Sequence, residues 1–232
     1  MRTPGIAVAL LFIALAAPPT LADATLTVRG EGRASAAPDL AVVRIGVETR
    51  APDAEAALEA NSREAAALIA EAKARGVADA DIQTSGLSLH PVYDDQRPRT
   101  GDAPRLSGFQ AANEVTVRLR AIGDVGTTLG ALVGAGANRL NGIEFGLADD
   151  RALTDAARRG AVADAVRKAT LYAEAAGVRL GEIRTIEEEG AGPQPRFAMR
   201  AMADRSEGAP VETGETVVTA SVRVVWEIGD DD

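Results

Sequence analysis

The stretch VGAGANRLNGIEF, residues 133–145, contains the residue types that hold phosphate in nucleotide-binding proteins. A glycine-rich loop binds phosphate when it follows a strand and opens a helix, because the free N–H groups of the first helical turn then face the anion. Here a helical pattern over 123–133 precedes the glycines and a strand pattern follows them. Arg139 also stands where the dinucleotide-binding fingerprint has its third glycine. The order of elements therefore argues against a phosphate site.

We interpret these glycines as the boundary between two structural elements. Gly134 and Gly136 end a helix, where a positive φ is favoured. Asn141-Gly142 is typical of a turn or a β-bulge. A second G-x-G, Gly30-Glu31-Gly32, follows a strand pattern, but Pro38 prevents a helix from starting there, so it is no better a phosphate site.

Nucleophilic and metal chemistry is restricted by composition. The chain has no cysteine, which excludes thiol nucleophiles, thiolate metal sites and disulfides. Its single histidine, His90, stands before Pro91 in an extended stretch, so one chain cannot build a three-histidine zinc site. The spacings S-x-x-K and G-x-S-x-G are absent. We assign no catalytic residue, no metal ligand and no cofactor.

Three runs of carboxylates are the remaining candidates for acid–base or metal chemistry. They are Asp149-Asp150, Glu187-Glu188-Glu189 and the terminal Asp230-Asp231-Asp232. Adjacent carboxylates on a surface are usually solvated, so an enzyme is the least favoured hypothesis.

The segment 190–214 is rich in glycine and proline and is expected to be a flexible loop. It contains Met199 and Met202, three residues apart, and Phe197. Exposed methionines absorb oxidant reversibly as sulfoxides. Phe197, Met199 and Met202 are therefore candidates for a subunit contact or an oxidation-sensitive loop; the alternative is a plain connector.

Residues 1–22 read as a signal peptide, with Arg2 before a charge-free apolar run over 5–17. That run is shorter than the roughly 20 residues that a spanning helix needs. We expect cleavage after Ala22 or Ala24 and an exported, soluble domain over 23–232 without a membrane span.

The net charge argues against nucleic-acid partners. The chain has 25 Lys plus Arg and 34 Asp plus Glu, and removal of Arg2 leaves 24 against 34, a net charge of −10. Binding to nucleic acid or anionic lipid depends on cationic side chains that neutralise phosphates.

Hydrophobic periodicity predicts an α+β fold, with a mainly antiparallel sheet and helices packed on one face. A division into two sub-domains is expected near residue 121. The longest helix should bury Leu153, Ala157, Ala161, Ala165, Ala169, Tyr172 and Ala176. Strands are expected over 25–32, 39–49, 81–93, 108–120, 178–189 and 215–228, with a further strand after residue 142, and helices over 53–76, 123–133 and 148–177.

The ordered set of segments resembles the SIMPL-domain family of bacterial periplasmic proteins, of the periplasmic immunogenic and oxidative-stress defence type. The segments that carry the resemblance are VRGEGRASAAPDLAVVRIGVET, GVADADIQTSGLSLHPVY, GFQAANEVTVRLR, GANRLNGIEF, AARRGAVADAVRKATLYAEAAGVRLGEI and GETVVTASVRVVWEI. They span nearly the whole mature chain.

The resemblance implies an exported protein that assembles into large homo-oligomeric rings and supports envelope integrity and tolerance of oxidative stress. It implies no catalytic residues. The leading hypothesis is therefore a periplasmic, non-enzymatic protein that acts through self-assembly. The solvent-exposed faces of its sheet would then supply the contacts between subunits. The alternative is a small-molecule or peptide binding module in which a sheet edge accepts an extended segment.

Overall fold

The computed structural model describes residues 24–94, 105–193 and 211–230. The signal peptide, its cleavage site and the loop residues Phe197, Met199 and Met202 lie outside these ranges.

The described residues form two antiparallel sheets with three helices, which confirms the predicted α+β class. One sheet has four strands in the order β3-β4-β2-β5, and the other has three in the order β1-β7-β6. The elements are β1 (Thr25–Ala36), β2 (Leu40–Ala51), α1 (Ala54–Ala74), β3 (Ile82–Tyr93), β4 (Leu106–Leu119), α2 (Val125–Gly134), β5 (Arg139–Gly146), α3 (Arg151–Ala176), β6 (Val178–Pro193) and β7 (Thr216–Asp230), with 3₁₀ turns at Asp79–Asp81 and Ile122–Asp124.

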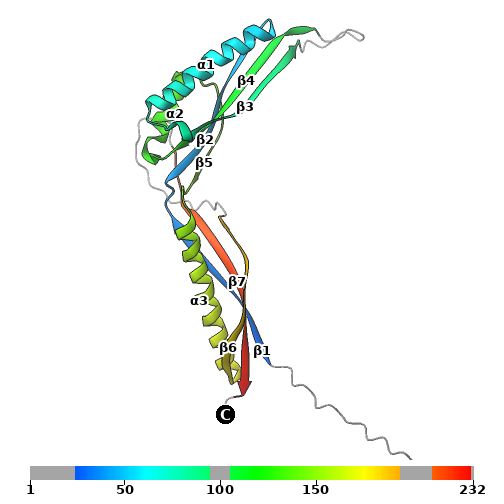
Figure 1. Ribbon diagram of the computed structural model, residues 1–232, viewed down its shortest axis with the longest axis vertical. Helices are drawn as coiled ribbons and strands as arrows, with labels where there is room; N and C mark the ends of the chain where they lie inside the picture. The colour runs from blue at the N-terminus through cyan, green and yellow to red at the C-terminus, as the bar shows by residue number, and fades with distance from the viewer. Residues whose placement is uncertain (1–23, 95–104, 194–210, 231–232) are drawn as a thin grey trace, which may run out of the picture.

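Figure 1 shows two lobes that lie end to end. The four-stranded sheet is covered by α1 and α2, and the three-stranded sheet by α3. The chain crosses between the lobes at residues 37–39 and 147–150. Asp39 joins both crossings, because its N–H donates to Gly146 O at 3.0 Å and its carboxylate accepts from Ala148 N at 2.7 Å. A sub-domain division near residue 121 stays a prediction.

The core of the four-stranded sheet follows the alternation of its strands. Ala41, Val43, Ile45 and Val47 of β2 are completely buried, as their period of two predicts. Helix α1 covers them. Its N-cap is Asp53, whose Oδ1 accepts a hydrogen bond from Ala56 N at 2.8 Å.

One polar residue, Asn61, is completely buried between α1 and this sheet. Its Nδ2 donates to Val47 O at 2.9 Å and to Ala111 O at 3.1 Å, so one amide joins the helix to β2 and β4. Its Oδ1 is buried without a partner in the described structure.

The core of the three-stranded sheet depends on a stripe of alanines. Ala157, Ala161, Ala165 and Ala169 of α3 form one buried cluster with residues of β1 and β7, and Ala173 of the same helix is also buried. Two predicted members of the stripe were wrong, since Tyr172 is 53% exposed and Ala176 is also exposed, and Leu153 is only partly buried. Steps of four residues turn the stripe slowly around the helix, so that it follows the twist of the sheet and reaches Ala173 instead.

Gly30 and Gly32 of β1 lie directly under this stripe. A Cβ at Gly30 would stand 2.1 Å from Ala161 O, and one at Gly32 would stand 2.0 Å from Ala157 O. The G-x-G of residues 30–32 therefore allows a helix backbone to approach a strand, which is one of the uses of glycine in a sheet.

Side chains of α3 also cover the free edge of β1. Asp164 Oδ2 accepts from Glu31 N at 3.0 Å, and Lys168 Nζ donates to Arg29 O at 3.0 Å. Lys168, the Glu31 N–H and Arg167 together hold the pKa of the Asp164 carboxyl well below its usual range. Charged side chains that occupy an edge in this way hinder pairing with another strand.

Candidate functional site

The segment 135–146, which follows α2, makes four polar side-chain contacts with β2 and β4 of the four-stranded sheet. Helix α2 ends at Gly134, and Gly136 has φ +112. The predicted positive φ is thus confirmed at Gly136 and was wrong at Gly134, which is not among the positive-φ glycines. The turn is closed by Gly136 N donating to Val133 O and Ala137 N to Leu132 O, both at 3.1 Å.

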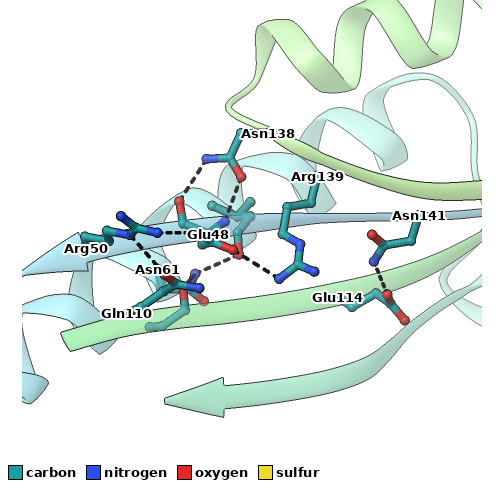
Figure 2. A network of polar contacts seen from close by, with 10 residues as sticks. Glu48, Arg50, Asn61, Gln110, Glu114, Asn138, Arg139 and Asn141 are labelled. Carbon is teal, nitrogen blue, oxygen red and sulfur yellow. Dashed lines mark hydrogen bonds and ion pairs between the residues drawn. The ribbon is translucent and has the colours of Figure 1, made fainter. Parts of the chain in front are cut away.

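Asn138 extends the pairing of β5 with β2 by means of its side chain. Its Oδ1 accepts from Glu48 N at 2.7 Å and its Nδ2 donates to Glu48 O at 2.8 Å (Figure 2). The amide therefore replaces one residue of backbone pairing.

The carboxylate of Glu48 lies between two arginines on this face. Arg139 Nη1 approaches Glu48 Oε2 at 3.1 Å, and Arg50 Nη2 lies 3.7 Å from Glu48 Oε1. Arg50 Nε in turn donates to Gln110 Oε1 at 2.9 Å. The chain of contacts in Figure 2 thus runs from β5 across β2 to β4.

Asn141 is the extra residue of a β-bulge, which confirms the interpretation of Asn141-Gly142. Arg44 pairs with Gly142 and Ile45 with Leu140, so Asn141 has no partner on β2. The bulge turns its side chain across the sheet, where Nδ2 donates to Glu114 Oε2 on β4 (Figure 2).

Gly46 makes this long contact possible. It lies on β2 between Arg139 of β5 and Glu114 of β4, and a Cβ there would stand 2.3 Å from Asn113 O. Because β2 carries no side chain at this position, the Glu114 carboxylate reaches across it to Asn141.

The Glu114 carboxylate is held in its ionised form. The hydrogen bond from Asn141 lowers its pKa most, followed by the hydrogen bond from Ser85 Oγ at 2.9 Å and the charges of Arg44 and Arg139. A carboxylate with a lowered pKa is a weak base and a poor proton donor near neutral pH. This cluster is therefore better suited to joining neighbouring strands than to proton transfer.

A hollow of about 240 Å³ lies beside this cluster, lined by Gly46, Gly86, Leu87, Ser88, Ala112, Asn113, Glu114, Arg139 and Asn141. A second hollow, of about 290 Å³, lies at the end of the sheet where α1 and β4 end and α2 begins.

In the described part of the chain, members of two of the carboxylate runs are engaged by arginines. Asp149 binds Arg151 at 2.6 Å, which lowers the pKa of its carboxyl to about 2. Glu188 binds Arg158 of α3 at 2.9 Å, whereas Glu189 binds Arg223 of β7 at 2.6 Å. Asp231 and Asp232 lie outside the described residues. His90 is exposed on β3 opposite Gln110, and no three His, Asp or Glu side chains of the described ranges form a metal-binding group.

Glu48, Glu114 and Asn138 were missed in the sequence analysis. The one local signal was Gly46, a single glycine inside an otherwise apolar strand, which indicates a bulge or a close approach.

Apolar side chains are exposed on β3 and β4. Leu87, Leu89 and Tyr93 alternate along one face of β3, and Tyr93 pairs with Leu106. The exposed fraction is 61% for Leu87, 39% for Leu89, 54% for Tyr93 and 53% for Leu106. We call these four residues the hairpin patch.

None of the helices in the described ranges is long and apolar enough to cross a bilayer.

Comparison with known proteins supports the resemblance seen in the sequence. A family model described as SIMPL, a protein of unknown function (DUF541), matches residues 26–226. The 26 kDa periplasmic immunogenic protein of Brucella melitensis biotype 1 is 33% identical over 219 residues, which cover 90% of this chain and 86% of that protein. The uncharacterized protein YggE of Escherichia coli K12 is 28% identical over 194 residues, covering 84% and 76%.

Proposed function

Because this chain belongs to the SIMPL family, we propose that it is an exported periplasmic protein that acts without catalysis, as a homo-oligomer that protects or scaffolds the cell envelope under oxidative stress. The apolar patch on the hairpin carries the self-assembly part of this proposal.

Export to the periplasm rests on two observations. Residues 1–22 have the charge and hydrophobicity of a signal peptide. A relative aligned with 90% of the chain is named a periplasmic protein.

Self-assembly rests on the hairpin patch. Leu87, Leu89 and Tyr93 lie on β3, an edge strand of the four-stranded sheet. Clustered apolar side chains at a sheet edge favour association, because a partner removes them from water. A second copy is the proposed partner, in keeping with the rings that the family resemblance implies.

A role without catalysis is supported by the pairing of the carboxylates on the four-stranded sheet. Glu48 and Glu114 are engaged by arginine or amide side chains of neighbouring strands. Such pairs stabilise a surface and present fixed charges to a partner. The oxidative-stress role rests on the resemblance, and a contribution of Met199 and Met202 to it stays a proposal.

The solution mass of the mature chain, measured by light scattering on a sizing column, tests the proposal. We expect a single large species. Replacing Leu87 and Leu89 by serine should lower the mass, whereas Leu171→Ser, which changes a leucine of similar exposure on α3, should leave it unchanged. A monomer at all concentrations would contradict self-assembly and make a binding module the leading function.

A further inference from the structure

Three of the edge strands in the two sheets are protected against pairing with a further strand. The edge strands are β1 and β6 in one sheet and β3 and β5 in the other. Side chains of α3 bind outward backbone groups of β1, and β5 is only eight residues long and carries Arg139 and Glu144. The charged residues of β6 are Arg179, Glu182, Arg184, Glu187, Glu188 and Glu189. Covering side chains, short length and charge are all known to hinder edge pairing.

β3 has none of these three forms of protection. It is twelve residues long and contains no Asp, Glu, Lys or Arg. Residues 86–92 pair one to one with residues 108–114 of β4, so this part of the strand is regular. Within the described ranges, residues 86–90 receive hydrogen bonds from β4 alone. β3 therefore presents a regular, uncharged edge at the margin of the four-stranded sheet (Figure 1), and such an edge is a template for another strand.

The two faces of this part of β3 differ in polarity. Leu89 lies opposite Ala111, which is completely buried on the side of the sheet that α1 covers. Leu87 and Leu89 therefore point to the α1 side, and Ser88 and His90 point to the uncovered side. Both leucines are nevertheless exposed. A strand added to β3 would cover them if its own apolar residues pointed to the α1 side as well.

We propose that β3 pairs antiparallel with β3 of a second copy, about a two-fold axis at Ser88. In this register Ser88 lies opposite Ser88 of the second copy, and Leu87 lies opposite Leu89 of the second copy. The leucines of both copies then form one cluster on the α1 side, where cross-strand apolar pairs stabilise a sheet. A shift by one residue would place the leucines of the two copies on opposite faces.

The sequence of β3 suits a second copy as the partner. The pattern Leu-Ser-Leu over residues 87–89 is symmetric about Ser88, as pairing with an identical strand requires. Gly86 would lie opposite His90, so the smallest residue faces a large one. Pro91, which has no N–H, stays outside the central pairs formed by residues 86–90. Because β3 carries no Asp, Glu, Lys or Arg, self-pairing brings no like charges of these residues together.

The inference rests on the proposed self-assembly and specifies the contact that makes it. The contact continues the hairpin patch, to which Leu87 and Leu89 belong. An isologous contact of this kind closes at two copies, so a larger species requires a second contact elsewhere on the chain.

Single cysteines test the register, since the chain contains no cysteine of its own. Opposite residues in an antiparallel pair have Cα atoms about 4.5–5.5 Å apart, and a disulfide spans about 4.4–6.8 Å. Ser88→Cys should therefore form a covalent dimer on mild oxidation, as a non-reducing gel would show. In His90→Cys the two cysteines would be four residues out of register and roughly 14 Å apart, so this variant should stay monomeric on the same gel.

A charge at the two-fold axis tests the contact without changing the leucines. Ser88→Lys would place two ammonium groups opposite one another and should weaken association about tenfold or more, measured as solution mass on dilution. Ser35→Lys, the same change at an exposed position of β1, should leave the mass unchanged. Thermal unfolding checks that each variant folds.

The outcomes separate this inference from the proposed function. If the wild type is larger than a monomer, the absence of a cross-link in Ser88→Cys, equal cross-linking in His90→Cys, or an unchanged mass in Ser88→Lys would each overturn the β3 contact and leave self-assembly standing. A monomeric wild type would overturn both and leave the edge of β3 to a foreign extended segment.

Discussion

Replacing Gly32 by alanine would place a methyl group inside the backbone of α3. The new Cβ would lie 2.0 Å from Ala157 O, 2.3 Å from Ala161 N and 2.8 Å from Gly160 C. Carbon and oxygen atoms normally approach to about 3.3 Å. Because all three obstructing atoms belong to the backbone, no side-chain rotation relieves the overlap, and α3 must move away from β1 by roughly 1 Å or more.

The expected cost is about 3 kcal/mol. Overpacking a core typically costs about 1–3 kcal/mol, and obstruction by backbone puts this position at the upper end. Alanine also lowers the conformational entropy of the unfolded chain relative to glycine, but this stabilises the fold by only about 0.5 kcal/mol. For a chain of this length, a loss of that size lowers Tm by on the order of 5–10 °C.

Gly130→Ala is the matched control. Gly130 lies inside α2, no heavy atom comes within 4 Å of an added Cβ, and its φ is not positive. Alanine is about 1 kcal/mol better than glycine in a helix, so this variant should be slightly stabilised. Replacing glycine by alanine should thus lower the free energy of unfolding at position 32 and raise it at position 130.

Thermal and urea unfolding of both variants measure the effect, and hydrogen exchange locates it. The two cores share no buried residue, so Gly32→Ala should lose exchange protection in α3, β1 and β7 before the four-stranded sheet does. A Gly32→Ala variant with unchanged Tm would refute the reasoning, and so would protection lost evenly from both sheets.

Three further predictions concern polar groups. Asn61→Asp would replace the Nδ2 group, which donates two hydrogen bonds, by a buried carboxylate oxygen that faces the same strand carbonyls. The free energy of unfolding should fall by about 3 kcal/mol or more at pH 7 and by less in acid, where the carboxyl is protonated, and urea unfolding at the two pH values would measure both. In the folded protein the pKa of Asp164 lies below its ordinary value of 3.8, so the ionised carboxylate stabilises the fold at pH values above 3.8. This stabilisation is lost as the pH falls from 3.8 through the pKa of the folded state. Asp164→Asn should therefore be less stable than wild type at pH 7, by a margin that narrows below about pH 4; a margin independent of pH would contradict this. Asn141→Ala should raise the pKa of Glu114 toward 4.5, and an unchanged NMR titration of that carboxyl would show that Asn141 does not hold it.

Features that depend on neighbouring residues were predictable from the sequence. Asp53 caps α1, Gly76 follows its end with φ +85, and Asn141-Gly142 forms a bulge. The alternation of β2 accounts for its four buried apolar side chains, Ala41, Val43, Ile45 and Val47. These features follow from local backbone conformation and from a period of two, neither of which requires knowledge of the rest of the fold.

Two predictions, one for α3 and one for the end of α2, were wrong. The buried stripe of α3 reaches Ala173 rather than Tyr172, because the helix follows a twisted sheet whose twist its own sequence does not reveal. Gly134 stays helical because the turn that ends α2 is made two residues later, at Gly136.

The sequence by itself determined the class of fold, the family and the boundaries of most elements. These features depend on hydrophobic periodicity and on residues typical of turns and helix ends, which can be recognised over short stretches of the chain. The sequence also excluded thiol chemistry, through composition alone. Only the tertiary structure brought Glu48 to Asn138 and Arg139, about 90 positions away, and Glu114 to Asn141 across Gly46. Such contacts depend on strand order and register, and a shift of one residue would turn every one of these side chains to the other face of the sheet.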